Sequence, residues 1–181
     1  MKTTCAPRAA ASTLDARAAP LTTSAQGLFA AEGVAGGRVE LRSITPHQAS
    51  LAGYGEIDIA LDSFPFAGLT VTSEALWQGV PVVTLAGDRP VGRMGASLLC
   101  ALGLDDLVAR DVPDYVRIAT ALAADLDRLA DLRAGLRARM AGSALCDGAG
   151  FARSVERAYR WMWRRWCAGQ GPEERFDGDG G

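Results

Sequence analysis

The sequence predicts an α/β fold in which a Rossmann-like parallel sheet carries flanking helices and the C-terminus is helical. Two short apolar runs, residues 59–61 and 82–84, are typical of buried parallel strands, and a segment long enough for a helix separates them. From residue 111 to residue 168, apolar side chains recur at helical spacing. Strands that alternate with helices along the chain favour a parallel sheet with helices packed on it.

The predicted lobe covers residues 22–168, and 49% of all residues are apolar, which is enough for a sizeable core. Residues 1–21 are rich in Ala, Thr, Arg and Pro without a clear period, so we expect that segment to be disordered. Residues 169–181 are polar and rich in glycine, and we expect a disordered tail there.

The first expected element is a helix over residues 22–32. Leu28 and Phe29 would give this helix a buried side, and Gly33 would end it. Residues 38–42 alternate between polar and apolar side chains, which predicts a strand.

A second short helix is expected next. Thr45 precedes Pro46, which is a capping residue followed by a favoured first helical residue. We expect the helix to run to about Tyr54 and to close at Gly55.

A strand, a loop, a helix and a second strand follow between residues 58 and 84. The first strand ends at Asp62, and the loop over residues 63–69 contains a proline and a glycine that turn the chain. Thr70 or Thr72 can cap the helix, and Glu74 would lie in its first turn. The apolar face of the helix and the glycine that ends it are expected at Ala75, Leu76, Trp77 and Gly79.

This arrangement places a loop rich in small and hydroxyl residues at the N-terminus of a helix, beyond the C-terminal end of a strand. The backbone N–H groups and the helix dipole can bind an anion at such a point, and ligands of open α/β sheets bind at this edge. The pattern is equally compatible with a βαβ unit that binds nothing and whose threonine serves only as a cap.

Four further helices and one short strand are expected downstream. Their ranges are 93–102 for a helix ended by Gly103, 107–109 for the strand, 111–124 for a helix capped by Asp111, 126–140 for a third helix, and 147–168 for a last helix capped by Asp147. The last helix has an apolar stripe that we expect to be buried, formed by Phe151, Val155, Tyr159, Met162 and Trp166. The arginines on its opposite face are expected to be solvated.

Composition narrows the possible functions. A formal net charge of −2 gives no reason to expect nucleic acid binding, and no apolar run is long enough to predict a membrane span. The N-terminus lacks the apolar core of a secretory signal. The four cysteines are far apart and there is one histidine, so we expect no metal site, buried free thiols and a cytoplasmic protein.

Residues 58–89, DIALDSFPFAGLTVTSEALWQGVPVVTLAGDR, carry a long and specific resemblance. They are similar to the C-terminal lobe of the SPINDLY and O-linked N-acetylglucosamine (O-GlcNAc) transferase family, and the likeness extends over roughly residues 22–168. The resemblance implies the C-terminal half of a glycosyltransferase of the GT-B type. Such an enzyme transfers N-acetylglucosamine from UDP-N-acetylglucosamine to Ser or Thr hydroxyls of proteins without a metal or other cofactor.

The resemblance also implies a UDP-sugar site built from loops that match this chain. The substrate-binding residues carried over are Thr45, His47, Gly68, Thr70, Thr72, Glu74 and Arg93. Several neighbouring positions depart from the family pattern, among them Ser50, Ala67, Leu69, Val71 and residues 90–92. Fewer side-chain donors around a diphosphate should weaken its binding by about 0.5–1.5 kcal/mol for each ordinary hydrogen bond. No catalytic residue is assigned.

The family's upstream helical repeats of 34 residues (TPR repeats) and its N-terminal lobe have no counterpart in this sequence. We therefore expect a C-terminal piece of such an enzyme, from a truncated or split gene, that is inactive in isolation. Its expected partners are the UDP-sugar, a separate chain that carries the missing lobe and the repeats, and an acceptor protein. Two alternatives stay open: a nucleotide-binding module without catalysis, and a structural remnant with neither ability.

Overall fold

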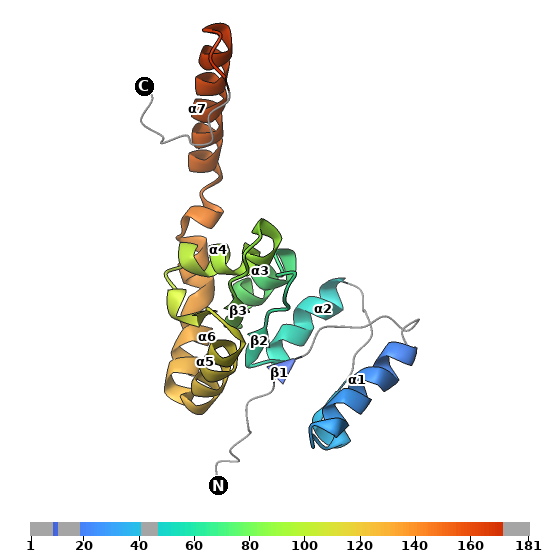
Figure 1. The fold of residues 1–181 in the computed structure, drawn as a ribbon. Helices are drawn as coiled ribbons and strands as arrows, with labels where there is room; N and C mark the ends of the chain where they lie inside the picture. Colours follow the sequence, from blue (N-terminus) through green and yellow to red (C-terminus); the bar gives the residue numbers. More distant parts are fainter. Residues whose placement is uncertain (1–8, 11–18, 41–46, 172–181) are drawn as a thin grey trace. The chain divides into compact units, whose positions relative to one another are not determined.

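The computed structural model describes residues 9–10, 19–40 and 47–171, with side chains described for residues 25–40 and 50–171. The chain divides into two compact units, residues 1–137 and residues 138–181. The first unit contains the sheet and most of the helices (Figure 1).

The sheet is parallel throughout, as predicted. Its strands lie in chain order, β1 (Ala9–Ala10), β2 (Ile59–Leu61), β3 (Val82–Leu85) and β4 (Val108–Ala109). Ala60 pairs with Val82 and Thr84 pairs with Val108, so β3 has a parallel neighbour on each side. Helices α3, α4 and α5 all contact β3, which places this strand at the centre of the unit.

The segment from β2 through α3 (Thr70–Trp77) to β3 forms because its apolar residues can be buried together. Ala75 and Leu76 on α3 are buried, and so is every residue from Val80 to Thr84. Gly79 has φ of 80°, a left-handed conformation that favours glycine, and Val80 N–H donates to the carbonyl of Ala75 as the helix ends. The predicted end of this helix is confirmed.

The first unit also contains α1, α2, α4, α5 and several single-turn 3₁₀ helices. Their bounds are α1 (Ala19–Ala31), η2 (Gly36–Arg38), α2 (His47–Gly53), η3 (Tyr54–Glu56), η4 (Pro90–Gly92), α4 (Met94–Ala101), η5 (Asp105–Leu107) and α5 (Val112–Ala124). α6 (Leu126–Ala141) continues into the second unit. Asp111 caps α5 as predicted, because its carboxylate accepts from the N–H of Asp114.

The predicted strand over residues 38–42 is wrong where the structure describes it. Arg38 ends the 3₁₀ helix η2, and Val39 N–H donates back to the carbonyl of Gly36. On the side of β2 away from β3, the neighbouring strand is instead β1, inside the segment 1–21 whose composition predicts disorder. α1 likewise begins at Ala19 rather than Thr22. Residues 41–42 lie outside the described residues.

Two expectations about burial are also wrong. On α1, Leu28 is 68% exposed and Phe29 is 38% exposed, so these side chains do not form a buried face among the described residues. The described cysteines Cys100, Cys146 and Cys167 are free, as expected, but exposed rather than buried.

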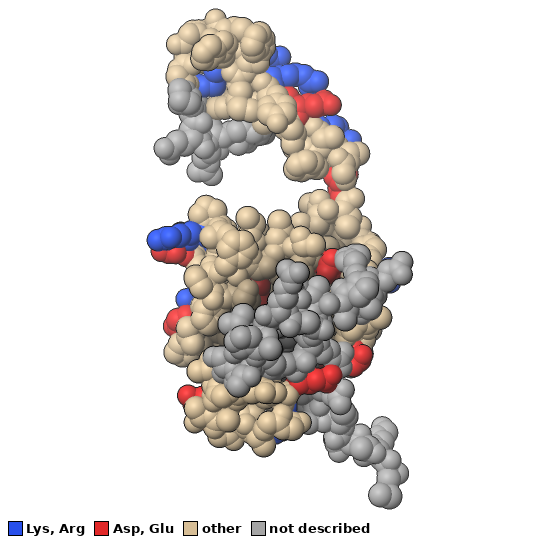
Figure 2. All heavy atoms as spheres, turned by 90° about the vertical axis from the view of Figure 1, so that its right-hand side faces the viewer, with Lys and Arg blue, Asp and Glu red and all other residues tan. Residues whose placement is uncertain are grey.

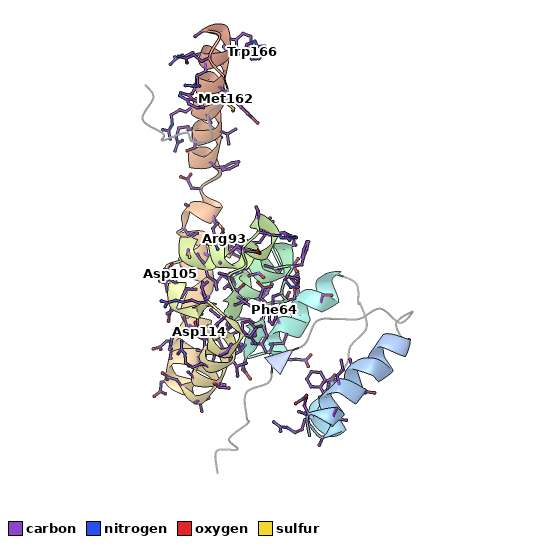
Figure 3. All side chains as sticks on the ribbon, viewed as in Figure 1. Phe64, Arg93, Asp105, Asp114, Met162 and Trp166 are labelled. Carbon is purple, nitrogen blue, oxygen red and sulfur yellow. The ribbon has the colours of Figure 1, made fainter. Side chains whose placement is uncertain are left out.

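The second unit contains η6 (Ala144–Cys146) and the long helix α7 (Gly148–Cys167). Asp147 caps α7 as predicted, because its carboxylate accepts from the N–H of Gly150. The apolar stripe of α7 is not buried as predicted: Phe151, Tyr159, Met162 and Trp166 are exposed, and Val155 is half-buried. Met162 and Trp166 project from the helix (Figure 3). Arginine side chains gather on the part of the molecule that contains α7 (Figure 2).

Candidate functional site

Two loops meet beyond the C-terminal ends of β2 and β3. The loop after β2 spans residues 63–69 and the loop after β3 spans residues 86–93; Phe64 and Arg93 mark them in Figure 3. Ala67 N–H donates to the carbonyl of Val91 at 3.1 Å, which ties one loop to the other. The backbones approach so closely that a Cβ on Gly92 would lie 2.9 Å from the carbonyl oxygen of Pro65.

Asp62 lies under both loops and connects four elements. One carboxylate oxygen accepts from the N–H of Gly68 at 2.8 Å, and the other accepts from the Thr84 hydroxyl of β3 at 2.7 Å. The backbone carbonyl of Asp62 accepts from the Tyr115 hydroxyl of α5 at 2.8 Å. The side chain is buried, and the two hydrogen bonds to its carboxylate offset the cost of removing its charge from water.

Two glycines bring helix N-termini close to this carboxylate. A Cβ on Gly95, in the first turn of α4, would overlap Asp62 Oδ2 and lie 2.6 Å from Thr84 Oγ1. A Cβ on Gly68, just before α3, would lie 3.1 Å from Asp62 Oδ1. The N-terminus of a helix carries a partial positive charge, so the position of α4 is favourable for an ionised carboxylate.

Tyr115 of α5 lies next to Asp62 and contacts the loop after β2. Its ring meets that of Phe64 edge to face, with the ring centroids 5.5 Å apart. Burial, and secondarily the nearby charge of Asp62, raises the pKa of Tyr115 to about 12. Tyr115 is therefore a neutral hydrogen-bond donor at physiological pH.

The N-terminus of α3 differs from the predicted cap. Leu69 is the N-cap residue and makes no side-chain capping bond, so neither Thr70 nor Thr72 caps the helix. Thr70 is exposed at the first helical position, whereas Thr72 is only 4% exposed. The first bond of the helix runs from Ser73 N–H to the Leu69 carbonyl, so the amides of residues 70–72 have no intrahelical acceptor.

Gly68 and Arg93 lie at this edge but are already engaged. The Gly68 amide donates to Asp62, and the exposed Arg93 donates through Nη1 to the carbonyl of Gly87 at 2.9 Å. Arg93 is the N-cap residue of α4 and brings a positive charge to the loop after β3. Its contact with Gly87 holds that charge within the loop.

Glu74 lies beyond the first turn of α3 and next to Tyr54 of η3. Tyr54 donates its hydroxyl to the carbonyl of Val71 at 3.2 Å. Burial, followed by the charge and hydrogen bonding of Glu74, raises the pKa of Tyr54. The expectation that Glu74 lies in the first turn is wrong, because that turn contains no acidic residue.

Thr45 lies outside the described residues, and His47 begins α2 with a side chain that is not described. Their predicted contact with a nucleotide therefore stays a prediction. The described residues contain no group of three or more His, Cys, Asp or Glu side chains arranged to hold a metal ion. None of the described helices is long and apolar enough to cross a membrane.

Comparison with known proteins identifies the family. The model of glycosyl transferase family 41 matches residues 22–155 of this chain. The chain belongs to glycosyl transferase family 41. The SPINDLY protein of Solanum lycopersicum, described as a probable UDP-N-acetylglucosamine–peptide N-acetylglucosaminyltransferase, is 49% identical over 122 residues, which are 67% of this chain and 13% of the relative. The corresponding Arabidopsis thaliana protein is 47% identical over the same length and the same shares of the two chains.

A solved O-GlcNAc transferase structure has the same fold. The K341M mutant of the Thermobaculum terrenum O-GlcNAc transferase superposes with a TM-score of 0.78 and 43% sequence identity, over 83% of this chain and 29% of that one. The present fold is therefore that of the C-terminal region of a GT-B O-GlcNAc transferase. The chain spans about an eighth of the length of the SPINDLY relatives that it matches.

Asp62, Thr84 and Tyr115 are not among the site residues predicted from the sequence of this family 41 chain. Asp62 had a usable signal, since a carboxylate that closes an apolar strand lies at the ligand edge of a parallel sheet. Thr84 is a hydroxyl residue within an apolar run, which indicates a buried polar partner. Nothing in the sequence around Tyr115 indicates a bond to a residue 53 positions earlier.

Proposed function

We propose that this chain binds the UDP portion of UDP-N-acetylglucosamine and forms the donor-binding part of a protein O-GlcNAc transferase. The observation that carries the proposal is the N-terminus of α3, where the amides of residues 70–72 lack intrahelical acceptors at the ligand edge of the sheet. Helix N-termini at this edge bind phosphate groups. Relatives at 47–50% identity are described as UDP-N-acetylglucosamine–peptide N-acetylglucosaminyltransferases.

In this proposal the diphosphate accepts from the α3 amides and from the Thr70 hydroxyl. Arg93 adds positive charge from the neighbouring loop, and its guanidinium has N–H donors beyond the one bonded to Gly87. Gly68 shapes the turn rather than donating, because its amide is bonded to Asp62. Thr72 is buried and supports the first turn of α3 from the core. Glu74 borders the site beside Tyr54. Thr45 and His47 are proposed as the remaining residues that contact the nucleotide.

The acceptor in the proposed reaction is a Ser or Thr hydroxyl of a protein, and the reaction takes place in the cytoplasm. The protein acceptor is supported by the names of the relatives, which are transferases that act on peptides. A separate chain that carries the other lobe and the helical repeats remains the partner that we propose. The three cysteines among the described residues are free and exposed, which fits a reducing compartment.

Titration of the 15N-labelled chain with UDP tests the proposal. We expect weak binding, with Kd on the order of 0.1–1 mM, because the site offers few side-chain donors. Chemical-shift changes should centre on residues 68–73 and 87–93, and they should persist in EDTA if no metal is needed. Thr70→Ala and Arg93→Ala should weaken binding, whereas the matched Arg153→Ala on α7 should not.

The same titration separates the alternatives. Binding without any sugar transfer, even when the remaining parts of a family member are supplied, would favour a nucleotide-binding module. No shift change at several millimolar UDP would overturn the proposed function and leave a structural remnant.

A further inference from the structure

We propose that Asp62 is a positioning residue for the UDP site: its carboxylate holds the start of α3 and the start of α4 in the arrangement that receives the ligand. This inference rests on the proposed function. Asp62 would not touch the nucleotide, since its oxygens are taken by Gly68 and Thr84 and its side chain is only 8% exposed.

The carboxylate of Asp62 holds the start of α3 in place. Gly68 is two residues before Thr70, so a bond from its amide to Asp62 fixes where the first turn of α3 begins. The amides of residues 70–72 can bind a diphosphate only if that turn has a fixed place and direction. Their orientation therefore depends on a carboxylate that lies behind the loop.

The carboxylate is itself held in place by β3 and α4. Thr84 is fully buried in β3 and donates to Asp62 Oδ2, which fixes the side chain against the most buried strand. Gly95 leaves no space between α4 and the same oxygen. One carboxylate thus connects β3 to the first turns of α3 and α4. Amide donors that are held in place before the ligand arrives bind it with less loss of entropy.

An aspartate at position 62 can make both connections through its two carboxylate oxygens. A buried carboxylate is costly, and no ion pair of Asp62 with Lys or Arg occurs in the described ranges of the chain. A carboxylate can accept two hydrogen bonds from different elements at once, whereas an asparagine side chain has only one acceptor oxygen. Asp62→Asn therefore keeps the size of the side chain but removes its charge, and it can keep the contact with Thr84 only if that hydroxyl changes from donor to acceptor.

The test compares five 15N-labelled forms of the full 181-residue chain: wild type, Asp62→Asn, Thr84→Val, Thr84→Ser and Asp147→Asn. Asp147 is the matched control, because its carboxylate also accepts from a glycine amide, that of Gly150 at 2.8 Å, in the other unit. For each form we measure the thermal midpoint, the position of the Gly68 amide signal without ligand, and Kd for UDP of the folded protein.

We expect Asp62→Asn to raise Kd for UDP roughly tenfold and Thr84→Val roughly threefold, which is the scale of losing fixed donors. Thr84→Ser keeps the hydroxyl and should restore wild-type affinity, and Asp147→Asn should not change it. The Gly68 amide proton should shift upfield in Asp62→Asn, because the bond to a charged acceptor is lost or weakened, and should stay in place in Asp147→Asn.

A merely structural role would lower the thermal midpoints of Asp62→Asn and Thr84→Val and leave Kd of the folded forms at the wild-type value. That result overturns the inference but not the proposed function, because the wild type still binds. Absence of UDP binding by the wild type overturns both. If Asp62→Asn does not fold, Thr84→Val decides, and wild-type affinity in that variant overturns the inference.

Discussion

Gly95 illustrates how closely a helix can approach a buried charge when it has no side chain there. It lies in the first turn of α4, against Asp62 Oδ2 and the Thr84 hydroxyl. Any larger residue must push the helix away from β3 or displace the carboxylate. The first movement would loosen the packing of α4 on β3, and the second would break the hydrogen bond between Thr84 and Asp62.

Gly95→Ala should therefore lower the free energy of unfolding by about 1–3 kcal/mol, the usual cost of overpacking a core. Gly135→Ala is the control, because Gly135 also lies in a helix but has nothing within 4 Å of an added Cβ. That change should be neutral or raise stability by up to about 1 kcal/mol through helix propensity. Urea unfolding measures both, and equal stability of the two variants would contradict the described packing at Gly95.

Tyr115 makes stability sensitive to alkaline pH. Its pKa is raised from the ordinary value of about 10 to about 12, first by burial and then by the charge of Asp62. The stabilisation from the neutral hydroxyl is fully present below about pH 10 and is lost as pH rises towards 12. The urea concentration at the midpoint of unfolding should therefore decrease as the pH is raised from about 10 to about 12.

Tyr115→Phe should be less stable at neutral pH, because it lacks the bond to the Asp62 carbonyl, and it should lose less stability than the wild type above pH 10. Tyr54→Phe is the control for a second, half-buried tyrosine, whose pKa is also raised. An unchanged pH profile in Tyr115→Phe would show that another group causes the alkaline loss.

At the scale of elements, helix caps are the features with the most direct energetic consequence. Asp111 accepts from the N–H of Asp114 at 2.8 Å and begins α5. Asp111→Ala should cost about 1 kcal/mol in the free energy of unfolding, whereas Asp111→Asn should cost far less, because Asn is also a good N-cap residue. Equal stability of the Ala variant and the wild type, in matched urea unfolding curves, would mean that this cap does not stabilise the fold.

The sequence predicts correctly those strands and helix ends that depend on a few adjacent residues. β2, β3 and β4 were expected from short apolar runs, and Asp111 and Asp147 from capping chemistry. Gly79 and Gly103 adopt positive φ where helices were expected to end. In each of these cases a few adjacent residues contain all the information that decides the structure.

Elements that depend on a distant partner were not predictable in the same way. The alternation over residues 38–42 is compatible with a strand, but the edge of β2 is occupied by Ala9–Ala10 and the 3₁₀ turn η2 takes Gly36–Arg38. The period of α7 shows which apolar residues share a face, yet it contains nothing about what covers that face. The side-chain bonds of Asp62 join residues 6 and 22 positions away, beyond any local pattern.

At the scale of the whole molecule, the length of the relatives determines what this chain can be expected to do alone. It matches 13% of the SPINDLY proteins and 29% of the solved O-GlcNAc transferase chain. At the candidate site, the donors identified are the α3 amides, the Thr70 hydroxyl and Arg93. In the proposed function these hold a diphosphate, but sugar transfer also requires an acceptor to be positioned against the donor.

We therefore expect the 181-residue chain, purified alone, to transfer no sugar from UDP-N-acetylglucosamine to a Ser- or Thr-containing protein, even where it binds UDP. Mass spectrometry of the acceptor measures this, with a full-length family 41 enzyme as the positive control. Detectable glycosylation by this chain alone would contradict the expectation and would require a complete active site within the chain.

The central place of β3 has a consequence for hydrogen exchange. Its backbone is paired on both sides and covered by α3, α4 and α5, so its amides should exchange with deuterium only when the whole first unit unfolds. Amides in the loop over residues 63–69 should exchange through local opening and at lower protection. A ligand that binds only the folded state slows global exchange by a factor of 1 + [L]/Kd. The slowest amides of β3 would thus report the occupancy of a site that they do not touch.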